Sequence, residues 1–80
     1  MLRKVRWLER WRSIDAVIRA TYEERPAHLR SIGIHVSIVA RRAGLSVGIV
    51  RSVGLSNTLQ HESMRARYHN GMFYVGRGDT

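Results

Sequence analysis

Apolar residues recur through the first 24 positions at the spacing of an α-helix. At 100° per residue they fall within one arc, and polar residues such as Arg6, Glu9 and Arg19 fall outside it. The pattern predicts one amphipathic helix over residues 3–24, ended by Pro26, whose ring clashes with a preceding helical turn. Ser13 could cap a second helix, so a break there is the alternative. The arc consists of Trp7, Leu8, Trp11, Ile14, Ile18 and Tyr22.

Trp7 and Trp11 lie one turn apart on this stripe. One interpretation is packing in the core of the domain. Another is a dimer seam, because two exposed indoles exceed what so small a body can cover. Binding to a membrane surface is a third. We expect a homodimer that uses Trp7 and Trp11.

The middle of the chain predicts a short extended segment and then two helices. Leu29 to Val36 alternates apolar residues with Gly33 and His35, as in a brief strand or an extended connector. The following region, residues 36–57, reads as a helix through Ala43, a reversal at Gly44 and a second helix that Ser46 caps.

Ala40, Gly44 and Val50 have the spacing of a particular two-helix motif: a small residue, a glycine four later and a branched apolar residue after six more. In this respect the chain resembles the helix-turn-helix of DNA-binding proteins. An ordinary helical hairpin is the alternative.

Residues 64–76 predict a β-hairpin about Asn70-Gly71, a pair that suits the positive φ angles of a type I′ turn. The pairing places Ala66, Tyr68, Phe73 and Val75 on one face, with Tyr68 opposite Phe73. The other face is cationic with one aromatic ring. A plain surface hairpin is the alternative to a nucleic-acid contact. This second face carries Arg65, Arg67, His69, Met72 and Tyr74.

The excess of basic residues narrows the range of partners that the protein could bind. The chain has 14 basic and six acidic residues, a net charge of +8, and no acidic residue between Arg25 and His61. All but one of the basic residues are arginine, which suits phosphate and guanine contacts. This excess of basic residues favours binding to a polyanion. The alternatives are that the charge only keeps the protein soluble or reflects codon bias.

Helix, short strand, two helices and two strands is the order of a winged helix, so residues 14–76 resemble winged helix-turn-helix transcriptional regulators. We expect one α+β domain over residues 1–80, mainly α-helical with a small β-hairpin. The resemblance implies binding to double-stranded DNA by operator occupancy, as a repressor, with the second motif helix in the major groove. The implied contacts are Arg41, Arg42, Ser46, Val47, Gly48, Arg51, Ser52, Arg65, Arg67, His69 and Asn70.

Other functions find little support. Cysteine is absent, acidic residues are few after residue 24, and the four histidines lack metal-ligand spacing. We therefore expect no catalytic residues, metal, cofactor or small-molecule ligand. No apolar run reaches the roughly 18 residues of a membrane span, which favours a cytoplasmic, nucleoid-associated protein. The alternative is a winged helix that binds protein or RNA within a larger assembly, through Val47, Ile49 and Leu55.

Overall fold

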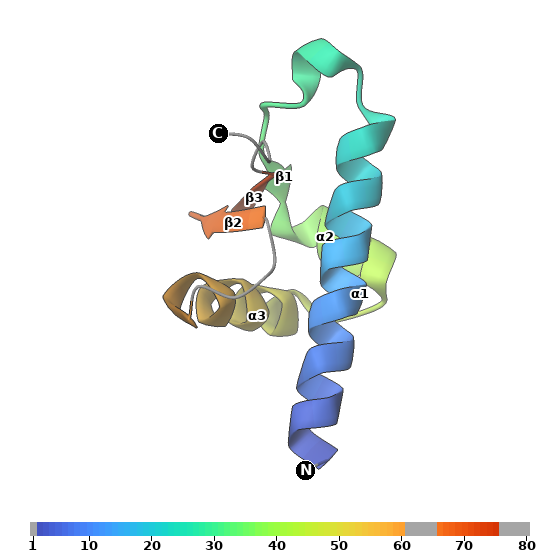
Figure 1. The fold of residues 1–80 in the computed structure, drawn as a ribbon. Coiled ribbons are helices and arrows are strands. Elements are labelled where there is room, and N and C mark those ends of the chain that lie inside the picture. The colour runs from blue at the N-terminus through green and yellow to red at the C-terminus, as the bar shows by residue number, and fades with distance from the viewer. Residues whose placement is uncertain (1, 61–65, 76–80) are drawn as a thin grey trace.

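The structure is a computed structural model that describes the backbone of residues 2–60 and 66–75, and the side chains of residues 9–56 and 66–75. Three helices precede a hairpin, and a short strand lies between the first two helices (Figure 1). This order confirms the predicted α+β fold. The elements are α1 (Leu2–Glu24), a 3₁₀ turn (Ala27–Leu29), β1 (Ile34–His35), α2 (Val36–Ala43), α3 (Val47–Gln60), β2 (Ala66–His69) and β3 (Met72–Val75).

The three strands form one antiparallel sheet in the order β1-β3-β2. In the hairpin, Tyr68 pairs with Phe73 and Arg67 with Tyr74, which confirms the predicted register. Asn70 and Gly71 have φ angles of 50° and 78°, as the predicted turn requires. The backbone N–H of Val36 donates to the carbonyl of Gly71 at 2.9 Å, so the hairpin turn lies against the start of α2.

The first helix is continuous through Ser13 and ends at Glu24, two residues before Pro26. The break considered at Ser13 is therefore absent. Of the segment predicted to be extended from Leu29 to Val36, only Ile34–His35 form a strand. Leu29 belongs to the 3₁₀ turn, and Val36 begins α2. Arginine side chains hold the connector: Arg25 donates to the Ile32 carbonyl at 2.6 Å, and Arg30 to the Glu23 carbonyl at 3.1 Å.

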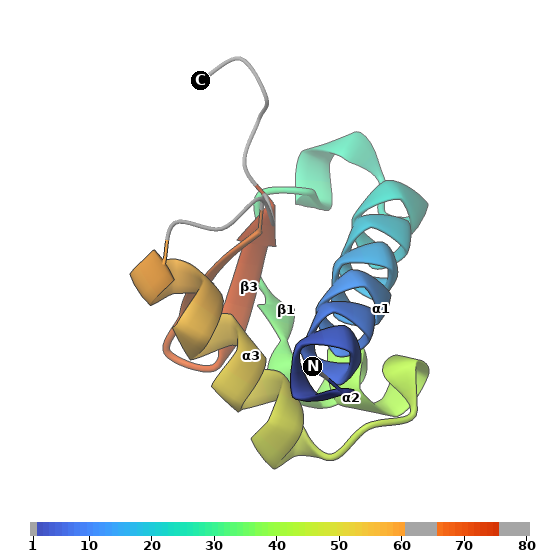
Figure 2. The ribbon, with the colours of Figure 1, turned by 60° about the horizontal axis from the view of Figure 1, so that its bottom comes forward.

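The core lies between the inner face of the sheet and the three helices (Figure 2). Phe73 is fully buried, and its ring centroid lies 5.1 Å from that of Tyr68. Every helix and every strand contributes to this core, so no element could bury its apolar face alone. Its members are Ile14, Ile18, Ile34, Val36, Val39, Ala40, Val50, Val53, Ala66, Tyr68 and Phe73.

The reversal between α2 and α3 depends on two capping residues. Gly44 has a left-handed backbone with φ 71°, and the N–H of Leu45 donates a hydrogen bond to the Ala40 carbonyl at 3.0 Å. The Ser46 hydroxyl accepts from the N–H of Ile49 at 3.1 Å and caps α3. Ala40 and Val50 are buried where the helices meet, as predicted. The topology is therefore that of a winged-helix-like α+β domain.

None of the helices described is long and apolar enough to cross a membrane.

Candidate nucleic-acid interface

One side of α3 is turned to solvent over its first nine residues. Val53 and Val50 point into the core, and the opposite side carries Val47, Gly48, Arg51, Ser52 and Leu55, all exposed. Ser46 is exposed beside them, where its hydroxyl already serves as the cap. The structure thus brings five of the predicted contact residues onto one surface: Ser46, Val47, Gly48, Arg51 and Ser52. We call these five residues and Leu55 the α3 face.

The α3 face contains a glycine that the fold does not explain. A Cβ atom on Gly48 would meet only the Ser46 hydroxyl oxygen at 3.9 Å, an ordinary van der Waals contact. A Cβ on Gly54, by contrast, would lie 2.8 Å from Cγ of Tyr68. Gly54 therefore lets the hairpin pack on α3, whereas Gly48 only removes bulk from an exposed surface, at a cost of about 1 kcal/mol in helix propensity.

The arginines whose side chains the structure describes fall into two groups. Arg19, Arg25, Arg30 and Arg42 bind carboxylates or carbonyls of the protein itself. The others, Arg10, Arg12, Arg41, Arg51 and Arg67, make no hydrogen bond or ion pair with the residues that the structure describes. This second group is available to an external anion, and it includes three of the predicted contacts.

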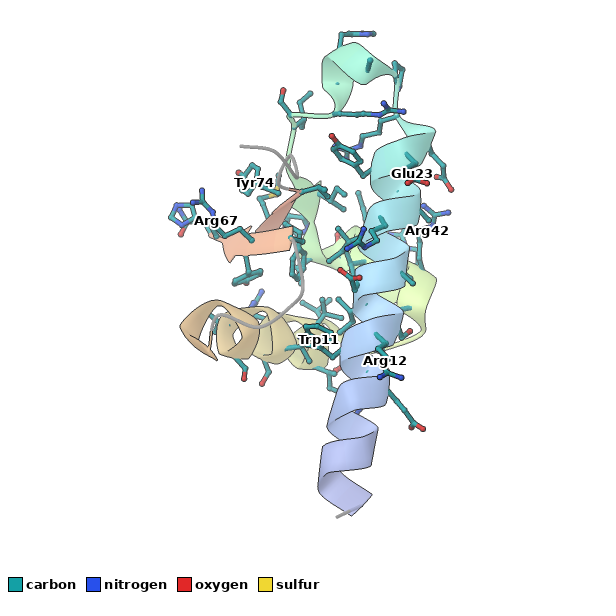
Figure 3. All side chains as sticks on the ribbon, in the orientation of Figure 1. Trp11, Arg12, Glu23, Arg42, Arg67 and Tyr74 are labelled. Carbon is teal, nitrogen blue, oxygen red and sulfur yellow. The ribbon has the colours of Figure 1, made fainter. Side chains whose placement is uncertain are left out.

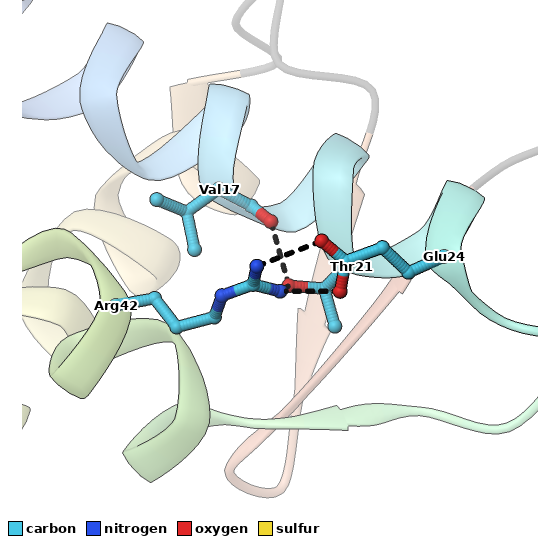
Figure 4. A network of polar contacts seen from close by, with 4 residues as sticks. All are labelled: Val17, Thr21, Glu24 and Arg42. Atoms are coloured by element: carbon cyan, nitrogen blue, oxygen red, sulfur yellow. Dashed lines mark hydrogen bonds and ion pairs between the residues drawn. The ribbon is translucent and has the colours of Figure 1, made fainter.

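Arg42 belongs to the paired group, although the sequence placed it among the DNA contacts. Its guanidinium donates to both carboxylate oxygens of Glu24, at 2.9 and 2.7 Å, and to the hydroxyl of Thr21 at 2.8 Å (Figure 4). The Thr21 hydroxyl donates in turn to the Val17 carbonyl at 2.8 Å. This network joins α2 to α1. A contact of Arg42 with DNA stays a prediction, and both of its terminal nitrogens already donate to residues of α1.

The same network changes the proton affinity of both charged groups. Hydrogen bonds from Arg42 hold the pKa of the Glu24 carboxyl below its ordinary value of 4.5, against the opposing effect of desolvation. The hydrogen bond to Glu24 likewise raises the pKa of Arg42. Both groups are exposed, so the pair orients α2 against α1 more than it stabilises the fold.

The predicted hairpin contacts do not share the α3 face. Tyr68 packs over Gly54, so the inner side of β2 faces α3. Arg67 projects from the other side (Figure 3), and the alternation along β2 places His69 there as well. Asn70 is exposed at the turn, with its amide 3.2 Å from Nε2 of His69. Arg65 lies outside the described residues.

The predicted tryptophan pair divides along α1. Trp11 is partly buried and packs against the core, between α1 and α3 (Figure 3). The side chain of Trp7 is outside the described part of the chain. The first turns of α1 extend past the rest of the domain (Figure 1). Trp11 therefore has a role within the protomer, and the dimer stays a prediction.

Two features of the surface were not predicted. The Tyr74 ring lies over Gly33, and the Glu24–Arg42 pair joins two helices 18 residues apart in sequence. Neither has a local sequence signal, because each depends on a contact between distant segments. Within the described residues, no group of three or more His, Cys, Asp or Glu side chains could hold a metal ion.

The chain matches no known protein family, and neither the curated proteins nor the solved structures include a significant match.

Proposed function

We propose that the protein binds double-stranded DNA as a small transcriptional regulator, most simply a repressor that occupies its operator, and has no catalytic activity. The α3 face would enter the major groove, as the second helix of a helix-turn-helix does. The observation that carries the proposal is the unpartnered Arg51 at the centre of that face, beside a glycine that nothing inside the domain requires.

Each residue of the α3 face has a contact that suits it. Arg51 can donate two hydrogen bonds to guanine, and the exposed Val47 can meet a thymine methyl group. Gly48 would let the helix backbone come close to the DNA. The exposed Arg41, in the last turn of α2, would bind a phosphate beside the groove. The hairpin turn with Asn70 lies at the start of α2. We expect it to contact the DNA backbone beside the groove.

Charge supports a nucleic-acid partner. The acidic residues of the described chain, Glu9, Asp15, Glu23 and Glu24, all lie on α1. Asp15 pairs with Arg19 of α1, and Glu24 pairs with Arg42 of α2. The described parts of α2, α3 and the sheet carry only basic charge, and within them we assign the α3 face and the neighbouring Arg41 to duplex DNA.

A protein-binding module is the second candidate, because two apolar side chains on the α3 face are exposed: Val47 by 37% and Leu55 by 51%. Ile49, expected to join them, is partly buried against the core. A protein partner would use the apolar pair without Arg51, so substitution of Leu55 but not of Arg51 would weaken its binding.

The test is titration of random and selected duplex DNA at several salt concentrations. Each phosphate contact contributes about 0.9 to the slope of log affinity against log salt. We expect a slope that reflects several contacts and selection of a preferred sequence. Arg41→Gln should weaken binding to all duplexes and lower the slope by about 0.9, the loss of one phosphate contact.

The matched control is Arg12→Gln, which removes the same charge from an exposed, unpartnered arginine on α1 (Figure 3). If Arg12→Gln and Arg41→Gln have equal effects, the binding reflects net charge and not this surface. Absence of duplex binding at low salt would refute the proposal.

A further inference from the structure

The outer side of the sheet, the side away from α3, carries a second cluster of side chains, all exposed except the half-buried Met72. His35 and His69 each pair with Met72, one from either neighbouring strand, so the three side chains form one row across the sheet. Arg67 pairs with Tyr74 in the next row. We call these five residues, His35, Arg67, His69, Met72 and Tyr74, the outer sheet face. No acidic residue of the described chain belongs to it.

Tyr74 is held by its surroundings and stays accessible. A Cβ on Gly33 would lie 2.8 Å from Cε1 and 2.9 Å from Cζ of Tyr74, so the ring rests where a side chain would otherwise be. The residue is nevertheless 36% exposed. An aromatic ring held against the sheet and partly open to solvent is a suitable platform for stacking a nucleobase.

The groups around Tyr74 are donors. Arg67 is exposed and makes no hydrogen bond or ion pair with the described residues, and it lies directly across from Tyr74 (Figure 3). Nδ1 of His35 accepts from the N–H of Ser37 at 3.1 Å, so the neutral ring carries its proton on Nε2. That proton makes His35 a hydrogen-bond donor and leaves its Nε2 without a lone pair for a metal.

We propose that the outer sheet face binds single-stranded DNA, with one base stacked on Tyr74 and a neighbouring phosphate held by Arg67. An aromatic ring beside the cationic guanidinium of Arg67 matches the two features that every single strand offers, an unpaired base and a phosphate. The choice of DNA over RNA rests on the function proposed above, whereas the stacking site itself does not.

This surface is distinct from the α3 face. Tyr68 on the inner side of β2 packs against α3, and Arg67 and Tyr74 project from the opposite side of the sheet. A duplex bound along the exposed side of α3 therefore leaves the outer sheet face uncovered. A single strand and a duplex bind the domain at the same time.

The experiment is a fluorescence anisotropy titration of a labelled 12-nucleotide oligothymidine, with and without a saturating unlabelled duplex. We expect the same affinity for the oligonucleotide in both cases. Tyr74→Leu should weaken its binding at least fivefold, since stacking contributes about 1–3 kcal/mol per base. Tyr74→Phe, which keeps the ring, should bind as the unmodified protein does.

Arg67→Gln should lower the slope of log affinity for the oligonucleotide against log salt by about 0.7, the value for one phosphate of a single strand. The control, Arg51→Gln, should leave oligonucleotide binding unchanged and reduce duplex binding. Circular dichroism checks the fold of each variant, and Arg67→Gln, which alters only an exposed side chain, keeps the test valid if Tyr74→Leu unfolds.

Three outcomes would overturn the inference. The first is that the oligonucleotide does not bind. The second is that duplex displaces the oligonucleotide and that Arg51→Gln also weakens oligonucleotide binding. The third is that the matching RNA binds at least tenfold more tightly than the DNA oligonucleotide. Duplex binding without oligonucleotide binding refutes this inference and leaves the proposed function standing. Oligonucleotide binding without duplex binding refutes the proposed function and supports the stacking site.

Discussion

Two glycines of α3 have opposite surroundings, which makes their substitution informative. Gly48→Ala adds a methyl group that fits without a clash, and Gly54→Ala adds one against the Tyr68 ring. We expect Gly48→Ala to raise the free energy of unfolding by about 0.5–1 kcal/mol through helix propensity. Gly54→Ala should lower it, because overpacking costs about 1–3 kcal/mol and exceeds that gain. Urea denaturation measures both changes.

The same Gly48→Ala variant tests the function. If the bare backbone is needed for close approach to DNA, duplex affinity falls while stability rises. An unchanged affinity would show that nothing approaches Gly48 closely.

Arg51 is expected to read a base. Arg51→Ala should reduce affinity for a preferred duplex by about 1–3 kcal/mol and remove discrimination at one base pair. The reason is that Arg51 is the only described side chain on the α3 face with a guanidinium that can meet guanine O6 and N7 together. Binding to the selected sequence and to its single-base variants is the measurement. Equal losses on all of them would assign Arg51 to a phosphate.

At the scale of the elements, the Glu24–Arg42 pair couples α1 to α2 and predicts a dependence on pH. The pKa of Glu24 is lower in the folded protein than its ordinary value of 4.5, so the unfolded chain binds more protons between the two values. The stabilising contribution is therefore complete above 4.5 and is lost as the pH falls through the lowered folded-state pKa.

Glu24→Gln should accordingly be less stable than the unmodified protein above pH 4.5, and the difference should shrink on further acidification. Thermal unfolding over a pH series measures this. The control is Glu23→Gln, which changes a neighbouring exposed carboxylate that makes no hydrogen bond or ion pair with the described residues. It should show a smaller difference. A Glu24→Gln difference that persists unchanged in acid would contradict the assignment.

At the scale of the whole molecule, the open question is self-association through α1. The first turns of α1 extend beyond the domain, and the sequence places Trp7 there, on the stripe that continues into the core. We expect a homodimer that positions two copies of α3 about one DNA turn, roughly 34 Å, apart. Trp7→Ala should yield folded monomers with much weaker duplex binding, as sedimentation and titration would show.

Trp11→Ala is a different test, because Trp11 packs against the core of its own protomer. It should lower the free energy of unfolding, whatever its effect on association. Unmodified protein that sediments as a monomer at tens of micromolar would refute the dimer.

The local features were open to prediction because local chemistry decides them. Helical periodicity gave α1, the left-handed preference of glycine gave the turn at Gly44, and Asn70-Gly71 determined the hairpin register. The short connector was predicted less well, because its conformation depends on hydrogen bonds from the side chains of Arg25 and Arg30. The alternating strand pattern does not determine it. The features that were predicted well have one property in common: their interacting residues are close in sequence.

The distribution of charge over the surface was decided by the tertiary structure alone. The sequence presents Arg41 and Arg42 as equivalent neighbours, yet the fold pairs Arg42 with Glu24 and leaves Arg41 exposed. It also sets Arg67 on the side of the sheet opposite α3, although both were expected on one DNA interface. Sequence determines how many charges a chain carries. Packing between distant segments determines which of them remain available to a partner, and on which side.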